Sequence, residues 1–177
     1  MTSPATRLTD RAIAVACAFA LGIQGSARRH GIPRLEEQIT GLVLGAVLLQ
    51  KNLPGEAPPL DLLLRRATAS CGVIAAHLHT GPCLRRLAAF RPGLVSGDQG
   101  DQALTLGLAV EGMALEVFAE GTFDKAEAME VMAILLALHV MAARPSATPR
   151  ALGRLRADIR RKARIFDQIM PSEAELA

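Results

Sequence analysis

Residues Ala103–Ala143 read ALTLGLAVEGMALEVFAEGTFDKAEAMEVMAILLALHVMAA and predict two helices joined by one tight turn. The first, Ala103–Ala119, carries only two charged residues, and from Val131 to Ala143 the one polar side chain is His139. A helix that is apolar on nearly every side lies at the centre of a bundle or in a membrane. Neither apolar run reaches the roughly 18 to 20 residues that a membrane span needs. We therefore expect both helices to be central in a helical bundle, with no transmembrane span.

Residues typical of helix ends mark the turn and the far end of this stretch. Gly121 favours the left-handed conformation that closes a helix. Asp124 precedes Glu127 by three residues, the spacing of a capping box, which satisfies unpaired N–H groups at the start of a helix. Pro145 disfavours helical geometry in the residue before it. These signals predict that the second helix covers Lys125–Ala143.

Apolar runs bounded by turn residues predict the other helices. We expect them at about residues 10–23, 35–51, 60–79, 84–90 and 150–170. Pro54–Pro59 is the clearest linker, and Thr80-Gly81-Pro82 is expected to stop the helix before it. The pattern predicts an all-α, single-domain bundle of five or six helices, with the hairpin at about residues 103–143 at its centre. Residues 1–145 form its core, and residues 146–177 form a linker and a basic amphipathic C-terminal helix.

Two glycines in the second expected helix indicate how it packs. Gly41 and Gly45 are four residues apart, so they lie on the same side of a helix. The apolar run around them is too short to span a membrane. We therefore expect a neighbouring helix of the bundle to approach closely at these two positions.

The composition favours helices and association over several kinds of ligand site. Half of the 177 residues are hydrophobic and the mean hydropathy is +0.27, so part of the apolar surface is expected to be covered by a partner or a second copy. Aromatic residues make up 3% of the chain, with no Trp and no Tyr. Sites for carbohydrates or single-stranded nucleic acids, which rely on stacking, are therefore disfavoured.

The cysteines and the N-terminus bear on the cellular compartment. Three widely spaced cysteines without a Cys-x-x-Cys motif do not suggest a disulfide framework, so we expect a cytoplasmic protein. An alternative is export, because residues 1–27 also have the outline of a signal peptide. Arg7 and Arg11 precede the apolar run Ala12–Ile23, and small residues follow it. Asp10 within the basic part argues against that alternative.

The polar residues of the apolar helices are the only candidates for chemistry. His77 and His79 point in nearly opposite directions on a regular helix, although His79 could meet Cys83 if the helix frays. Glu111 lies on an apolar face and needs a partner, for which Arg65 or Arg66 is expected. No spacing matches a zinc site, a di-iron bundle or a hydrolase motif.

We therefore predict no enzyme, no metal and no cofactor. A small helical metal- or ligand-dependent enzyme built on His77, His79, Glu111 and His139 remains an alternative function.

The expected C-terminal helix carries the positive charge of the protein. Residues 144–177 contain eight Lys and Arg against four Asp and Glu, whereas residues 1–143 contain 12 against 13. Such a helix can dock an apolar stripe and present a basic face to an acidic protein, a nucleic acid or an anionic membrane surface. The candidate partner-binding residues are Arg154, Arg156, Arg160, Arg161 and Arg164.

These features predict a non-enzymatic interaction protein, an adaptor, chaperone or regulator that binds a protein partner, forms a homo-oligomer, or does both. A helical nucleic-acid-binding regulator is the alternative, and peripheral membrane contact is possible through the same arginines.

Overall fold

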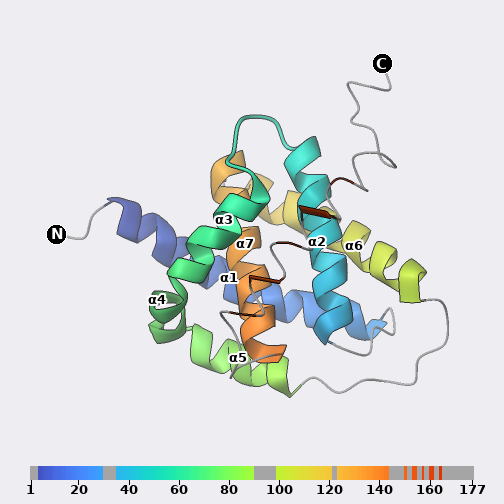
Figure 1. Ribbon diagram of the computed structural model, residues 1–177, viewed down its shortest axis with the longest axis horizontal. Coiled ribbons are helices and arrows are strands. Elements are labelled where there is room, and N and C mark those ends of the chain that lie inside the picture. Colours follow the sequence, from blue (N-terminus) through green and yellow to red (C-terminus); the bar gives the residue numbers. More distant parts are fainter. Residues whose placement is uncertain are drawn as a thin grey trace.

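The computed structural model describes residues 4–29, 35–89, 99–120 and 123–143, and positions 150, 153, 154, 157, 160, 161 and 164. All regular structure in these residues is helical, which confirms the all-α class (Figure 1). Seven helices, rather than five or six, occur within the continuous described ranges. They are α1 (Pro4–Arg29), α2 (Leu35–Asn52), α3 (Leu60–Ala69), α4 (Cys71–Ala76), α5 (Thr80–Ala88), α6 (Gln99–Glu120) and α7 (Lys125–Ala143).

An additional helix arises because the expected helix at residues 60–79 is broken into α3 and α4. The Thr68 hydroxyl donates a hydrogen bond to the Leu64 carbonyl at 2.7 Å, a contact that often bends helices. Ser70 then ends α3 and precedes α4. Thr80-Gly81-Pro82 begins α5 instead of stopping a helix. Pro82 is accommodated there because the first turn of a helix leaves its N–H groups without intrahelical partners.

Helix α7 lies at the centre of the fold. It packs against α1, α2, α3 and α5 (Figure 1), and every residue from Ala128 to Val140 except Glu130 is buried. Its 19 residues include an 18-residue window with a mean hydropathy of 1.7, so its length and composition alone would suffice to cross a membrane. The sequence-based length estimate was therefore too short. Core helices also meet these criteria, and 67% of the window is buried within the fold.

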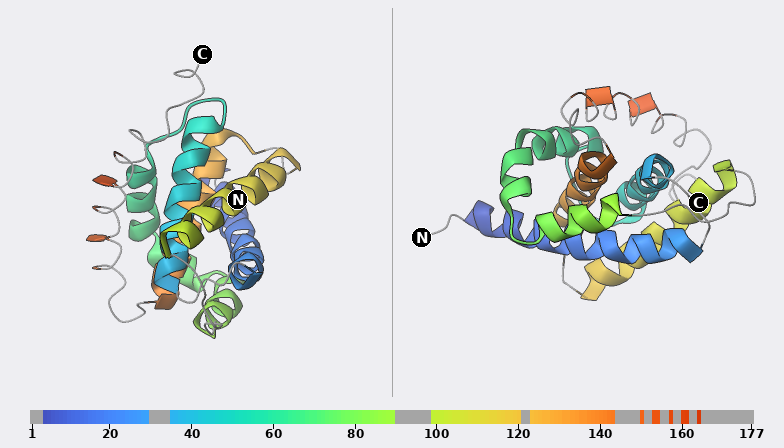
Figure 2. Two further views of the ribbon diagram at one scale, coloured as in Figure 1. Left: turned by 90° about the vertical axis from the view of Figure 1, so that its right-hand side faces the viewer. Right: turned by 90° about the horizontal axis from the view of Figure 1, so that it is seen from below.

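Helix α6 packs on α2 and makes little contact with α7, so the expected central hairpin is wrong in its packing. Figure 2 shows α6 crossing the outer side of α2. A Cβ atom at Gly41 would lie 2.8 Å from Leu106 Cδ2, and one at Gly45 would lie 2.8 Å from Val110 Cγ1. The close approach expected at these glycines is confirmed, and α6 is the helix that makes it.

The capping box before α7 is present as predicted. The Glu127 N–H donates to Asp124 Oδ1 at 2.8 Å, and the Asp124 N–H donates to Glu127 Oε2 at 3.1 Å. These two bonds satisfy N–H groups that the helix itself leaves unpaired. They explain why α7 begins at Lys125, as the sequence indicated. Gly121 and Pro145, the other expected boundary residues, lie outside the described residues.

Candidate functional site

The described arginines of the basic segment, residues 150–164, are exposed and helical. They are Arg150, Arg154, Arg160, Arg161 and Arg164. Arg160 Nε donates to Asp61 Oδ2 on α3 at 2.9 Å, and the Arg160 side chain remains 56% exposed. The described fragments of the segment lie alongside α3 in Figure 2. The expected candidate Arg156 lies outside the described residues.

Glu111 has a different partner from the one expected. Asn52 at the end of α2 donates from Nδ2 to Glu111 Oε1 at 2.8 Å. The prediction of Arg65 or Arg66 was wrong because it assumed that Glu111 faced α3. Helix α6 instead lies on α2, which brings the carboxylate to the α2 C-terminus.

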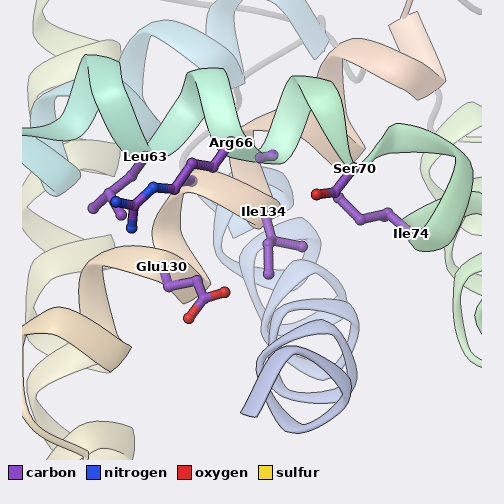
Figure 3. Close-up of a pocket in the computed structure, with 8 residues that line it drawn as sticks. Leu63, Arg66, Ser70, Ile74, Glu130 and Ile134 are labelled. Carbon is purple, nitrogen blue, oxygen red and sulfur yellow. The ribbon is translucent and has the colours of Figure 1, made fainter. Parts of the chain in front are cut away.

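Arg66 lies near another carboxylate, that of Glu130, in a pocket between α3, α4 and α7 (Figure 3). Burial raises the pKa of Glu130, the positive charge of Arg66 opposes that rise, and Glu127 adds to it. Ser70, Leu63 and Ile134 also line the pocket. Its volume is about 100 Å³, below the roughly 300 to 1,000 Å³ of pockets that enclose small molecules. The Arg66 charge beside the Glu130 carboxylate therefore fits charge compensation within the fold better than it fits a substrate-binding site.

His77 and His79 come together in the turn between α4 and α5. Their ring centroids are 5.5 Å apart, and the His79 N–H donates to His77 Nδ1 at 3.3 Å. The other ring nitrogen of His77 lies 3.9 Å from Asp10 Oδ1. The expectation that the two rings diverge was wrong because this turn replaces the regular helix assumed from the sequence.

His139 belongs to the hydrophobic core. Its side chain is fully buried on α7, and Nδ1 is 2.9 Å from the Leu135 carbonyl, which fits an N–H donor at Nδ1. Nε2 has no hydrogen-bond partner. Burial lowers the pKa of His139 to about 4.

Of the four polar residues considered for an enzyme, His77 and His79 contact each other, whereas Glu111 and His139 engage Asn52 and the Leu135 carbonyl. Within the described part of the chain, no group of three or more His, Cys, Asp and Glu side chains could hold a metal ion.

The sequence did not indicate the proximity of Cys17 and Cys83. Cys17 lies on α1 and Cys83 on α5, and both line a pocket of about 490 Å³ together with His79 and Arg86. His79 and Cys83 therefore line one pocket, and the Cys83 N–H donates to the His79 carbonyl at 3.3 Å, whereas a meeting of their side chains stays a prediction. Cys17 joins them only because α1 packs against α5, a contact that no local pattern predicts.

No family model matches this sequence, and no match occurs among curated proteins or solved structures.

Two large apolar side chains are exposed on the outer side of α6. Leu108 is 48% and Leu115 39% exposed, and the exposed Gly112 lies between them in sequence. Leu115 also borders a groove of about 530 Å³ that includes Phe118, Phe123 and part of the Pro54–Pro59 linker. Helix α2, by contrast, is covered from Gly41 to Leu49. It therefore offers no exposed apolar face for association over these residues.

Proposed function

We propose that this protein is a non-enzymatic adaptor, chaperone or regulator that binds an acidic surface of a protein partner through the basic segment. The observation that carries the proposal is the exposure of Arg154, Arg160, Arg161 and Arg164, of which Arg160 contacts α3. Arg160 already contacts a carboxylate, that of Asp61. A partner would extend this pattern of contacts to further arginines of the segment.

The chemistry of arginine supports an acidic partner. A planar guanidinium presents several donors that match a carboxylate, and such charge-assisted hydrogen bonds are stronger than neutral ones. The Arg160–Asp61 contact joins Arg160 to α3 and leaves more than half of the Arg160 side chain exposed. Because residues 1–143 are nearly balanced in charge, the positive field is local to this segment. Such a field speeds association with an acidic surface.

Nucleic acid and anionic membrane surfaces are the competing ligands for the same arginines. Phosphates also accept hydrogen bonds from guanidinium groups. The absence of Trp and Tyr from the chain removes the residues that most often stack on bases. We therefore place an acidic protein first and make the other two ligands outcomes of the test.

The test compares two charge-reversed proteins as baits in native-host lysate. The first variant, Arg154→Glu with Arg164→Glu, reverses two charges of the proposed surface. The second, Arg65→Glu with Arg85→Glu, is the control and reverses two exposed arginines on α3 and α5. The lysate is treated with nuclease, and captured proteins are identified by mass spectrometry and by cross-links to the basic segment. We expect a protein that wild type and the α3–α5 variant capture and that the segment variant loses. If nuclease treatment abolishes the capture of all proteins, the result favours nucleic acid as the ligand. If the wild-type protein is retained only by anionic vesicles, the result favours a membrane surface.

We also propose that the protein self-associates through the outer side of α6. This contact would form the homo-oligomer expected from the composition. Leu108 and Leu115 are seven residues apart and therefore lie on one side of the helix. Together with Gly112 they form an apolar surface that a second copy of α6 could cover. This surface is on a different helix from the basic segment, so the two proposals can fail independently.

A further inference from the structure

Cys17 and Cys83 bring two thiols together from helices that are far apart in the sequence. The Cys83 thiol donates to the Cys17 carbonyl oxygen, with a distance of 3.8 Å from Sγ to O across a separation of 66 residues. Cys17 Sγ lies 4.0 Å from the Thr80 hydroxyl oxygen. Helices α1 and α5 lie side by side (Figure 2), so the tertiary fold holds the pair in place.

The two thiols differ in their readiness to lose a proton. The neighbouring Cys83 side chain lowers the pKa of the Cys17 thiol to about 7, with burial opposing this change and the Thr80 hydroxyl adding to it. The Cys17 side chain and burial both raise the pKa of the Cys83 thiol. Cys17 is therefore the more acidic thiol of the pair, and Cys83 holds its proton more firmly. A thiolate is the nucleophilic form of cysteine.

The pocket beside the pair gives a small reagent a route to it. Cys17 and Cys83 are 4% and 3% exposed. They line the pocket of about 490 Å³, whose other lining residues include the exposed His79, Pro82 and Arg86. Because the sulfurs are nearly covered, only a reagent of a few atoms can reach them. Hydrogen peroxide meets this requirement.

We propose that Cys17 and Cys83 are a peroxide-oxidised dithiol site that closes to a reversible disulfide between α1 and α5. The Cys17 thiolate attacks one oxygen of hydrogen peroxide, the O–O bond breaks, and the departing hydroxide takes a proton to become water. Cys17 is then a sulfenic acid. Cys83 gives up its proton and attacks the Cys17 sulfur. The S–O bond breaks as the S–S bond forms, and hydroxide leaves and takes that proton as a second water. Overall, two thiols are oxidised and one peroxide is reduced.

Cys71 provides a matched internal comparison. It lies on α4, is partly buried, and does not line the pocket of the pair. Burial raises the pKa of its thiol, which keeps it protonated and a poor nucleophile. The site uses neither the basic segment nor the outer side of α6, so it does not depend on the proposed function.

The experiment treats the folded, fully reduced protein with a small molar excess of hydrogen peroxide. Catalase then removes the peroxide, the protein is denatured, and the remaining thiols are counted and mapped. We expect the three free thiols to fall to one. The intact mass should fall by two hydrogen atoms, a cross-linked peptide should join Cys17 to Cys83, and dithiothreitol should restore all three thiols. Retention of three thiols, or a disulfide that includes Cys71, overturns the proposal.

Two variants separate the roles of the cysteines. Cys71→Ser should still lose two thiols under the same treatment. Cys83→Ser should form no intramolecular disulfide and should instead accumulate a sulfenic acid at Cys17, detected as an adduct with dimedone that is present while the protein is denatured. An unlabelled Cys17 in a folded Cys83→Ser protein contradicts its role as the attacking thiol. Circular dichroism establishes folding, and peptide mapping of wild type decides the proposal if a variant does not fold.

Discussion

Gly107 of α6 lies directly against Leu44 of α2, with no room for a Cβ atom between them. Such an atom would be 2.7 Å from Leu44 Cδ2 and 2.8 Å from Leu44 Cγ. Because the whole Leu44 side chain is in the way, a shift of its far end alone would not relieve the overlap. The α2–α6 contact thus depends on glycines from both helices. Gly107 lies on α6, and Gly41 and Gly45 lie on α2.

Gly107→Ala should destabilise the protein by about 1 to 3 kcal/mol, the usual cost of inserting a methyl group into a packed interior. Gly112→Ala is the matched control on the same helix, because a Cβ there meets nothing within 4 Å. The control should be neutral or stabilise the fold by up to about 1 kcal/mol, since alanine favours helix over glycine. Urea unfolding of both variants measures the difference. Equal stabilities would contradict the close α2–α6 packing.

Leu135→Ala should cost roughly 2 to 5 kcal/mol, as large-to-small changes in a packed core do. Leu135 is fully buried on α7, at the centre of the fold. Leu108→Ala, on the exposed side of α6, should change the free energy of unfolding by no more than about 0.5 kcal/mol. Thermal and urea unfolding give both values. A Leu135→Ala protein as stable as wild type would contradict the position of α7.

His139 should make the fold less stable in mild acid. Burial lowers its pKa to about 4 in the folded protein, against 6.5 for an unperturbed imidazole. Between these values the unfolded chain binds a proton that the folded protein does not, so stability falls as the pH drops from 6.5 toward 4. The contribution of the buried, neutral His139 to the free energy of unfolding is fully present above pH 6.5.

The difference of about 2.5 pKa units corresponds to about 3 kcal/mol once the pH is below both values. His139→Leu should remove this part of the pH dependence, whereas the exposed His79→Asn should keep it. Urea unfolding of all three proteins at pH 7.5 and 4.5 provides the comparison. The same pH dependence in wild type and His139→Leu would rule out a buried, neutral histidine.

The salt dependence of binding separates a protein partner from nucleic acid. If Arg154 and Arg164 contacted DNA phosphates, changing both to Ala would reduce the slope of log K against log salt by about 1.8, at 0.9 for each contact. For an acidic protein surface we expect slower association with the partner and no measurable duplex DNA binding at physiological salt. Fluorescence anisotropy with a labelled duplex and stopped-flow mixing with the partner measure the two effects. Tight DNA binding that these changes abolish would overturn the protein-partner proposal.

Changes on the outer side of α6 should alter self-association without altering folding. Leu108→Ser with Leu115→Ser should shift a dimer toward monomer in sedimentation, because these are the large apolar side chains exposed on α6 in the described residues. Thr105→Ala, also exposed on α6, is the control and should leave the mass unchanged. Wild type that sediments as a monomer at all concentrations removes the α6 proposal.

Local signals predicted the elements whose ends are determined by local chemistry. Helix α7 begins and ends where expected, since the Asp124–Glu127 capping box forms as its spacing indicated. Helix α2 extends one residue beyond its expected end, and the Pro54–Pro59 linker is free of helix.

Where the prediction failed, tertiary contacts or hydrogen bonds that the apolar pattern does not record decide the outcome. Glu111 pairs with Asn52 because α6 packs on α2, and its own apolar surroundings do not reveal that choice. The break at Ser70 depends on hydrogen bonds in the last turn of α3, which the apolar pattern does not record. Cys17 and Cys83 meet through the α1–α5 contact, so no spacing rule could have paired them.

Helix α6 is attached to the fold on one side, so α6 and α7 differ in the free energy of local unfolding. Most of its packing is against α2, whereas α7 is enclosed by four helices. Segments with fewer buried contacts open locally at lower free energy than the global unfolding reaction. The amide hydrogens of α6 would therefore exchange with solvent deuterium through partial opening, while those of α7 would exchange only when the whole chain unfolds. A partner that covers Leu108 and Leu115 would raise the protection of α6 toward that of α7.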